Sequence, residues 1–150
     1  DFDPDYYKQC VYLSATDEIV GIVYERGFIE LLKYNVITGR PQLLSTLTDN
    51  NFTTIASDRQ SRLYAILRGD DHISPSIVEV DITDGTFSEK AILDEDPDNF
   101  EQIVFMSSTE DIVGIKDHLR LMKVNMLTGE TSVYKQLDPA ASYYELITID

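Results

Sequence analysis

The stretch Leu31–Arg40, LLKYNVITGR, returns twice more along the chain, as Ile77–Thr86 (IVEVDITDGT) and Leu121–Glu130 (LMKVNMLTGE). Each copy has two aliphatic residues, a charge, an aromatic residue or Val, an Asn or Asp, turn-forming residues and then Gly. An Asn or Asp side chain can accept backbone N–H bonds at the end of a strand, and Gly supplies a positive φ. Each copy therefore predicts the same tight hairpin between two strands.

The hairpins recur at a regular spacing. Asn35, Asp81 and Asn125 are 46 and 44 residues apart. A weaker second pattern precedes each hairpin: EIVGIV at Glu18–Val23, RLYAIL at Arg62–Leu67 and DIVGIK at Asp111–Lys116. Self-similarity at a period of about 40 to 50 residues is typical of blade-like repeats.

Within each repeat the pattern is that of β-strands. The apolar runs are short, rich in Val, Ile, Leu and Tyr, and bounded by Asp, Asn, Gly, Ser or Thr. No segment carries the helical i, i+3, i+4, i+7 stripe over the ten or so residues that a helix requires. We expect four strands per repeat, which in the middle repeat are Phe52–Asp58, Arg62–Gly69, Ser76–Ile82 and Phe87–Leu93.

Several of these strands are apolar on both faces. In the middle repeat Leu63, Ala65 and Leu67 are expected to point one way, and Tyr64 and Ile66 the other. A sheet that lies between two neighbouring sheets needs such strands. Four-stranded antiparallel sheets repeated in this way form a β-propeller. We therefore predict an all-β, β-propeller-like single domain over residues 1–150, with blades at about 8–49, 50–98 and 99–140 and an extra strand at 142–150.

The predicted number of blades is smaller than a closed ring needs. Propellers have about four to eight blades, and three blades leave sheet faces and strand edges open to water. Two explanations remain open. The chain is a section of a longer propeller, an interpretation that the extra strand favours, or copies of the chain associate, for example two chains giving six blades.

Composition and charge exclude several classes of function. The 150 residues carry a net charge of −15, whereas binding to nucleic acid or to an anionic membrane surface depends on Lys and Arg. No apolar run approaches the roughly 18 residues of a membrane span, so we expect no membrane insertion. The single cysteine, Cys10, excludes an internal disulfide and is predicted to be a small buried hydrophobe. Because the chain begins at Asp1 rather than Met, we expect a processed or excised segment.

The repeat resembles a group of known families. FTTIASDRQSRLYAI and SIVEVDITDGTFSEKAIL are similar to the repeats of secreted bacterial propellers, namely the YVTN-type, quinoprotein-like and lipoprotein propellers. The resemblance implies the propeller fold and an exported bacterial protein, located outside the cell, in the periplasm or on the cell surface. Those families often carry Gly where Ser61 stands, and the chain has no Trp, so the resemblance does not extend to a quinone-cofactor enzyme.

In a propeller, the loops that leave the second and fourth strands of each blade share one face. Here those loops are acidic, and we predict that they form the ligand-binding face, with Arg68, Asp70, Asp71, His72, Asp117 and His118 as its candidate residues. Hard cations prefer several carboxylate oxygens, so a Ca²⁺ site is the alternative for Asp94, Glu95, Asp96 and Asp98. A solvated acidic loop is the favoured interpretation of these four residues. No other cofactor is expected.

Two functions remain as hypotheses, beside the third interpretation of a purely structural fragment that binds no ligand. The first is a non-enzymatic propeller module that binds a protein or a glycan, with its specificity in the loops. The second is a propeller-type polysaccharide hydrolase or lyase that uses loop carboxylates, held about 5 to 9.5 Å apart, from different blades. Convergent carboxylates in a central funnel would favour the enzyme, and acids spread in solvent would favour the binding module.

Overall fold

The computed structural model describes residues 7–25, 28–47, 52–69, 74–94, 100–117 and 119–137. Within these ranges the chain is all-β, with three four-stranded antiparallel sheets and no helix. The first sheet contains β1 (Tyr7–Leu13), β2 (Glu18–Glu25), β3 (Phe28–Asn35) and β4 (Pro41–Leu47). The second contains β5 (Phe52–Ser57), β6 (Leu63–Leu67), β7 (Ser76–Val80) and β8 (Phe87–Ile92). The third contains β9 (Phe100–Met106), β10 (Asp111–Lys116), β11 (Arg120–Asn125) and β12 (Thr131–Gln136).

Each sheet is a meander in which strands adjacent in sequence are hydrogen-bonded neighbours. The prediction of four antiparallel strands per repeat is therefore confirmed. In the middle repeat the observed strands begin and end within two residues of the predicted ones. The extra strand predicted at 142–150 lies outside the described residues.

The repeated Asn/Asp–Gly hairpins have the predicted chemistry. The carboxamide oxygen of Asn35 accepts hydrogen bonds from the backbone N–H groups of Ile37 (3.1 Å) and Thr38 (2.9 Å). Asn125 and Asp81 make corresponding bonds in the other two hairpins. The glycines take left-handed φ angles of 63° at Gly39, 76° at Gly85 and 74° at Gly129. The recurrence of the Asn/Asp–Gly pattern thus follows from one turn geometry that the chain uses three times.

A second left-handed position precedes the second strand of each sheet. Asp17, Ser61 and Glu110 have φ angles of 53°, 62° and 55°, and each is followed directly by the residue at which the second repeat pattern begins. Ser61 thus takes a left-handed conformation that Gly adopts at lower cost. Its hydroxyl also accepts a hydrogen bond from the backbone N–H of Ala15 at 2.8 Å, a contact that Gly could not make.

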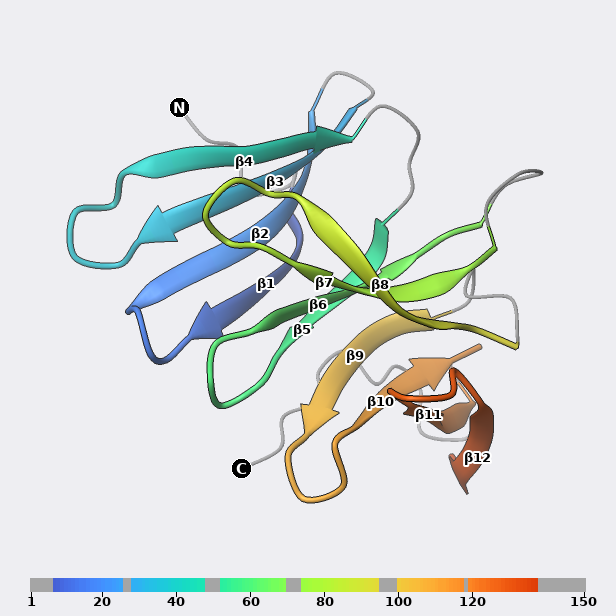
Figure 1. The fold of residues 1–150 in the computed structure, drawn as a ribbon. Helices are drawn as coiled ribbons and strands as arrows, with labels where there is room; N and C mark the ends of the chain where they lie inside the picture. The colour runs from blue at the N-terminus through green and yellow to red at the C-terminus, as the bar shows by residue number, and fades with distance from the viewer. Residues whose placement is uncertain are drawn as a thin grey trace.

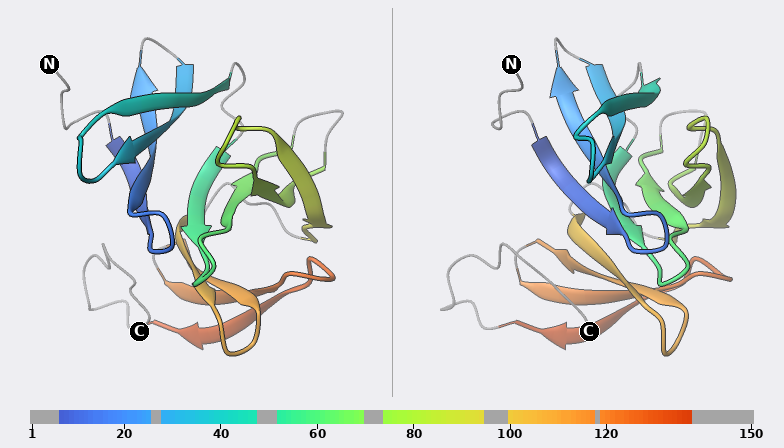
Figure 2. Two further views of the ribbon diagram at one scale, coloured as in Figure 1. Left: turned by 60° about the vertical axis from the view of Figure 1, so that its left-hand side comes forward. Right: turned by 90° about the vertical axis from the view of Figure 1, so that its left-hand side faces the viewer.

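The three sheets follow one another in space in the order of the sequence (Figure 1). The first strand of the second sheet, β5, lies against β1 of the first sheet and β9 of the third. Figure 2 shows the outermost strands β4, β8 and β12 away from these inner strands. We call the contact between the first and second sheets the first joint, and the contact between the second and third sheets the second joint.

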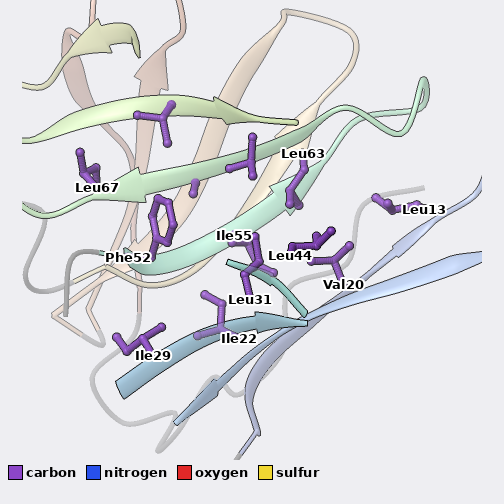
Figure 3. Close-up of a cluster of buried hydrophobic side chains, with 13 residues drawn as sticks. Leu13, Val20, Ile22, Ile29, Leu31, Leu44, Phe52, Ile55, Leu63 and Leu67 are labelled. Carbon is purple, nitrogen blue, oxygen red and sulfur yellow. The ribbon is translucent and has the colours of Figure 1, made fainter. Parts of the chain in front are cut away.

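The second sheet is buried on both faces, as its sequence pattern predicts. Leu63, Ala65 and Leu67 belong to a hydrophobic cluster that fills the first joint, together with residues of the first sheet (Figure 3). Tyr64 and Ile66, which alternate with them, belong to a second cluster that fills the second joint. Each joint is therefore a hydrophobic core between two sheets, and the middle sheet takes part in both.

Polar contacts fix the first joint along its inner strands. The side-chain amide of Gln9 on β1 bonds both backbone groups of Ile55 on β5, accepting from its N–H and donating to its carbonyl, each at 2.8 Å. The same amide oxygen accepts a bond from the Thr54 hydroxyl at 2.7 Å. One side chain thus satisfies strand-edge groups that would otherwise need a backbone partner.

At the outer side of each joint, a hairpin of one sheet packs against the last strand of the sheet before it. A Cβ atom placed on Gly85 would lie 2.4 Å from the carbonyl oxygen of Leu44 on β4. One placed on Gly129 would lie 1.7 Å from the carbonyl oxygen of Ile92 on β8. These two glycines are required by the close approach of backbones as well as by their left-handed φ.

The prediction that Cys10 is buried is wrong, because its thiol is exposed. The register explains the difference. Cys10 pairs with Gly21 in the first sheet, as Ile55 pairs with Ala65 and Ile103 with Gly114. In the second and third sheets this position faces the preceding sheet and is buried. No sheet of the described chain precedes the first one, so Cys10 stays open to solvent.

Candidate functional site

Two of the six residues predicted for the ligand-binding face lie in the described chain. Arg68 follows the end of β6 and is exposed. Asp117 follows β10, has a left-handed φ of 54° and forms an ion pair with Arg120. Asp70, Asp71, His72 and His118 lie outside the described residues. The predicted face therefore stays a prediction.

The proposed calcium ligands are divided in the same way. Asp94 is described, and its carboxylate accepts a hydrogen bond from the backbone N–H of Thr131 at 3.1 Å. It thus helps to fix the second joint. Glu95, Asp96 and Asp98 lie outside the described residues. Among the residues that the structure describes, no group of three or more His, Cys, Asp or Glu side chains could hold a metal ion.

The structure instead reveals a groove at the second joint. It has a volume of about 210 Å³ and lies on the side of the turns that connect first to second and third to fourth strands. This is the side opposite to the predicted ligand-binding face. Its walls are Arg62, Tyr64 and Lys90 from the second sheet, and Phe105, Thr109, Glu110, Asp111, Asn125, Met126 and Leu127 from the third.

An exchange of charges distinguishes the second joint from the first at the position of the groove. In the first joint, Lys33 on β3 donates a hydrogen bond to the carbonyl of Ile82 in the next hairpin, at 2.9 Å, and pairs with Glu18 at 3.4 Å. The register places Glu79 at the position of Lys33, since Glu79 pairs with Tyr64 as Lys33 pairs with Val20. A carboxylate has no proton to donate to a carbonyl.

Glu79 therefore forms an ion pair within its own sheet, with Lys90 on β8. The hairpin residue that corresponds to Ile82 is Met126, and it lines the groove. The third sheet has the charge arrangement of the first, with Lys123 and Asp111 paired at 2.7 Å. The second sheet thus has its acidic and basic positions exchanged relative to the other two sheets, and the groove lies next to these positions.

A buried carboxylate organises the wall that the second sheet provides. The side chain of Asp58 is fully buried and accepts hydrogen bonds from the backbone N–H groups of Gln60 and Arg62, both at 2.9 Å. Its other oxygen accepts a bond from Nε of Arg62 at 2.5 Å. Buried charges are tolerated where they are paired and hydrogen-bonded. Asp58 therefore orients the Arg62 guanidinium along the groove while 49% of the Arg62 side chain stays exposed.

Two aromatic rings form the floor between the sheets. The rings of Tyr64 and Phe105 stack with centroids 5.4 Å apart and planes at 12°. The Arg62 guanidinium lies over the Tyr64 ring at 5.9 Å, within the range of a cation–π contact. Burial, followed by the nearby charge of Asp58, raises the pKa of the Tyr64 phenol to about 12. The phenol is thus a neutral hydrogen-bonding group at physiological pH.

The groove combines cationic side chains, the acidic side chains of Glu110 and Asp111, and apolar surface within a small volume. Arg62 and Lys90 supply cations whose side chains are 49% and 40% exposed. Leu127 and Met126 supply apolar surface, and Leu127 is 88% exposed at the tip of its hairpin. Such a mixture suits reversible binding of a side chain that has an apolar part and a carboxylate.

The spacing of the repeats alone does not indicate this groove. The sequence places Tyr64 on the second apolar face of its strand, and its 4% exposure confirms that this side chain is buried there. A comparison of the repeats contains a usable signal, because Arg62 stands where the other repeats have Glu18 and Asp111. Glu79 likewise stands where they have Lys33 and Lys123.

No protein-family model matches the chain. A search of curated proteins likewise finds no significant match. In the parts of the chain that the structure describes, no helix combines the length and the apolar character needed to cross a membrane.

Proposed function

We propose that this chain forms part of a β-propeller and serves as a non-enzymatic binding module for a peptide segment of another protein. The propeller arrangement is supported by three meander sheets in sequence order, whose first strands lie together and whose middle member is buried on both faces. The observation that carries the binding function is the groove at the second joint. The resemblance of the repeats to secreted bacterial propellers supports an exported location for the module.

A peptide fits the groove better than a glycan does. Sugar binding by proteins commonly uses an open aromatic ring face, and amphipathic rings are suited to it. Here the Tyr64 ring is almost fully buried and already contacts Phe105 and Arg62. The exposed side chains that line the groove are those of Leu127, the two cations Arg62 and Lys90, and Thr109 and Glu110. A peptide that carries an apolar side chain next to a carboxylate would contact Leu127 and the two cations.

The volume of the groove limits what it can take. Pockets for drug-sized ligands occupy about 300 to 1,000 Å³, whereas this one has about 210 Å³. It accommodates one or two side chains rather than a whole folded surface. We therefore expect a weak contact, in the micromolar to millimolar range for an isolated peptide.

The test uses peptides selected from a random phage-displayed library against the whole 150-residue chain. Affinity is then measured by calorimetry for the wild type and three variants. Leu127→Asp and Lys90→Glu should each weaken binding by about tenfold or more, since the first removes the exposed apolar side chain and the second reverses one of the two cations. Ile37→Asp is the matched control, because Ile37 occupies in the first hairpin the position of Leu127 and is 84% exposed.

Equal affinity of all four proteins for every selected peptide would refute the groove as the binding site. A failure to enrich any peptide over an unrelated acidic protein would refute the binding function. Circular dichroism of each variant verifies the fold before binding is measured.

A further inference from the structure

The groove at the second joint has walls of opposite charge. The second sheet provides two cations, Arg62 and Lys90. The third sheet provides two acids, Glu110 and Asp111. Asp111 is buried and is paired with Lys123 at 2.7 Å, whereas Glu110 is exposed. Glu110 is therefore the acid of the groove wall that a ligand can reach.

The turn between β9 and β10 fixes the backbone of Glu110. Its N–H donates a hydrogen bond to the carbonyl of Met106 at 2.9 Å. The N–H of Thr109 donates to the same carbonyl at 3.3 Å, and the φ angle of Glu110 is left-handed, at 55°. The carboxylate is thus carried by a formed turn, so a ligand that binds it does not have to order this segment of backbone.

The first sheet contains the same turn with a different use of its acid. The stretch Gln9–Glu18, QCVYLSATDE, aligns without a gap with Gln102–Asp111, QIVFMSSTED. In this alignment Asp17 corresponds to Glu110, and both residues have a left-handed φ. The carboxylate of Asp17 accepts a hydrogen bond from the hydroxyl of Tyr12 in its own sheet.

The third sheet lacks this hydroxyl. Phe105 stands where the first repeat has Tyr12, and its ring has no hydrogen-bond donor. The ring stacks instead on Tyr64 in the groove. The side chain of Glu110 makes no hydrogen bond or ion pair with any residue of the described chain. The exchange of Tyr for Phe thus leaves a carboxylate at the groove wall with its acceptor positions open.

On the opposite wall, Arg62 keeps donors for a second partner. Its side chain bonds Asp58 through Nε, whereas a guanidinium has five N–H donors in a planar fork that suits a carboxylate. Within the part of the chain that the structure describes, its terminal nitrogens make no hydrogen bond, and no ion pair joins Arg62 to Glu110. Both groups are therefore available to one ligand at the same time.

We infer that the groove recognises a peptide segment with charges of both signs, whose carboxylate binds Arg62 and whose lysine or arginine side chain binds Glu110. The inference rests on the proposed peptide-binding function and specifies the ligand of the same groove. A segment with a carboxylate alone would face the acids of the third sheet without compensation, and like charges brought together oppose binding. The net charge of −15 also repels a ligand that is acidic overall.

The test extends the selection of peptides against the whole 150-residue chain. The selected peptides should carry Lys or Arg as well as Asp or Glu, together with an apolar residue. Calorimetry then compares one such peptide with a version in which its Lys or Arg is replaced by Ala, on the wild type and on Glu110→Gln. The replacement should weaken binding to the wild type by about three- to fivefold, as for an exposed ion pair. It should leave binding to Glu110→Gln nearly unchanged.

Glu130→Gln is the matched control. Glu130 is an exposed acid of the third hairpin and does not line the groove. The control removes the same charge and should bind the peptide like the wild type. Equal weakening by Glu110→Gln and Glu130→Gln would overturn the inference, because the effect would then come from net charge. Selected peptides without a cation, or an equal cost of the Ala replacement on the wild type and on Glu110→Gln, would overturn it as well.

The variants Leu127→Asp and Lys90→Glu distinguish this failure from a failure of the proposed function. If they weaken binding while Glu110→Gln does not, the groove binds a peptide without using its acidic wall, and only the inference is overturned. If no peptide is enriched, or if both variants bind every peptide like the wild type, the proposed function and the inference are both overturned.

Discussion

The three hairpin glycines provide a direct test of how the sheets interlock. We consider Gly39→Ala, Gly85→Ala and Gly129→Ala, each measured at low protein concentration. All three substitutions place a Cβ atom at a left-handed φ between 63° and 76°. This conformation costs an L-residue roughly 1 to 2 kcal/mol, and less after allowance for the reduced freedom of the unfolded chain. Only two of the three substitutions also create a clash.

The size of the clash follows from the contacts. The new Cβ has no described neighbour within 4 Å at Gly39, lies 2.4 Å from the Leu44 carbonyl oxygen at Gly85, and 1.7 Å from the Ile92 carbonyl oxygen at Gly129. The partner in both clashes is the backbone of a paired strand, so relief requires the hairpin to separate from the sheet before it. Overpacking of this kind costs about 1 to 3 kcal/mol.

We expect the free energy of unfolding to fall by about 1 kcal/mol for Gly39→Ala and by about 3 to 5 kcal/mol for Gly129→Ala, with Gly85→Ala between them. For a domain of this size, 1 kcal/mol lowers Tm by about 2 to 4 °C. Differential scanning calorimetry should therefore show a drop of about 2 to 4 °C for Gly39→Ala and of more than about 6 °C for Gly129→Ala. Equal drops in the three variants would refute the docking of the second and third hairpins.

Two further predictions concern single side chains. Lys33→Met removes the hydrogen bond to the Ile82 carbonyl and the ion pair with Glu18. Urea unfolding should therefore show a free energy of unfolding that is lower by about 1 to 2 kcal/mol. An unchanged urea midpoint would contradict the role of Lys33 in the first joint. The pKa of the Tyr64 phenol is raised to about 12 in the folded chain. Between pH 10 and about 12 the unfolded chain therefore loses the phenol proton while the folded chain keeps it. The free energy of unfolding falls as pH rises through that window. In urea unfolding measured at several pH values, the free energy of unfolding of Tyr64→Phe should fall less steeply over the same pH range than that of the wild type. Identical slopes of the free energy against pH for the two proteins would exclude Tyr64 as the cause.

The sequence was sufficient to predict the strands, the hairpins and the two-sided burial of the middle sheet. The repeated Asn/Asp–Gly pattern determines a local turn, and the alternation of Leu63, Ala65 and Leu67 with Tyr64 and Ile66 determines the two faces. Both are short-range properties of the chain. They need no knowledge of how the sheets are placed.

The groove and the solvent exposure of Cys10 could not be predicted from strand patterns. Both depend on which sheet covers which face, a long-range property that strand patterns do not encode. The apolar run around Cys10 indicates burial, yet the residue lies on the face for which the described chain provides no neighbour. The groove lies between two sheets, where Glu79 takes the position that Lys33 has in the first sheet, and the Lys33 contact is with a hairpin carbonyl of the next sheet.

The central claim is that the second sheet is buried between the other two. Amide hydrogen exchange of β6, the second strand of that sheet, tests this claim most directly. The backbone groups of β6 are paired with β5 and β7, and side chains on both of its faces are fully buried. Its amides should therefore exchange only through global unfolding, and more slowly than those of the last strands β4 and β12. Exchange of β6 as fast as that of β12 would contradict the stacked arrangement and, with it, both joints.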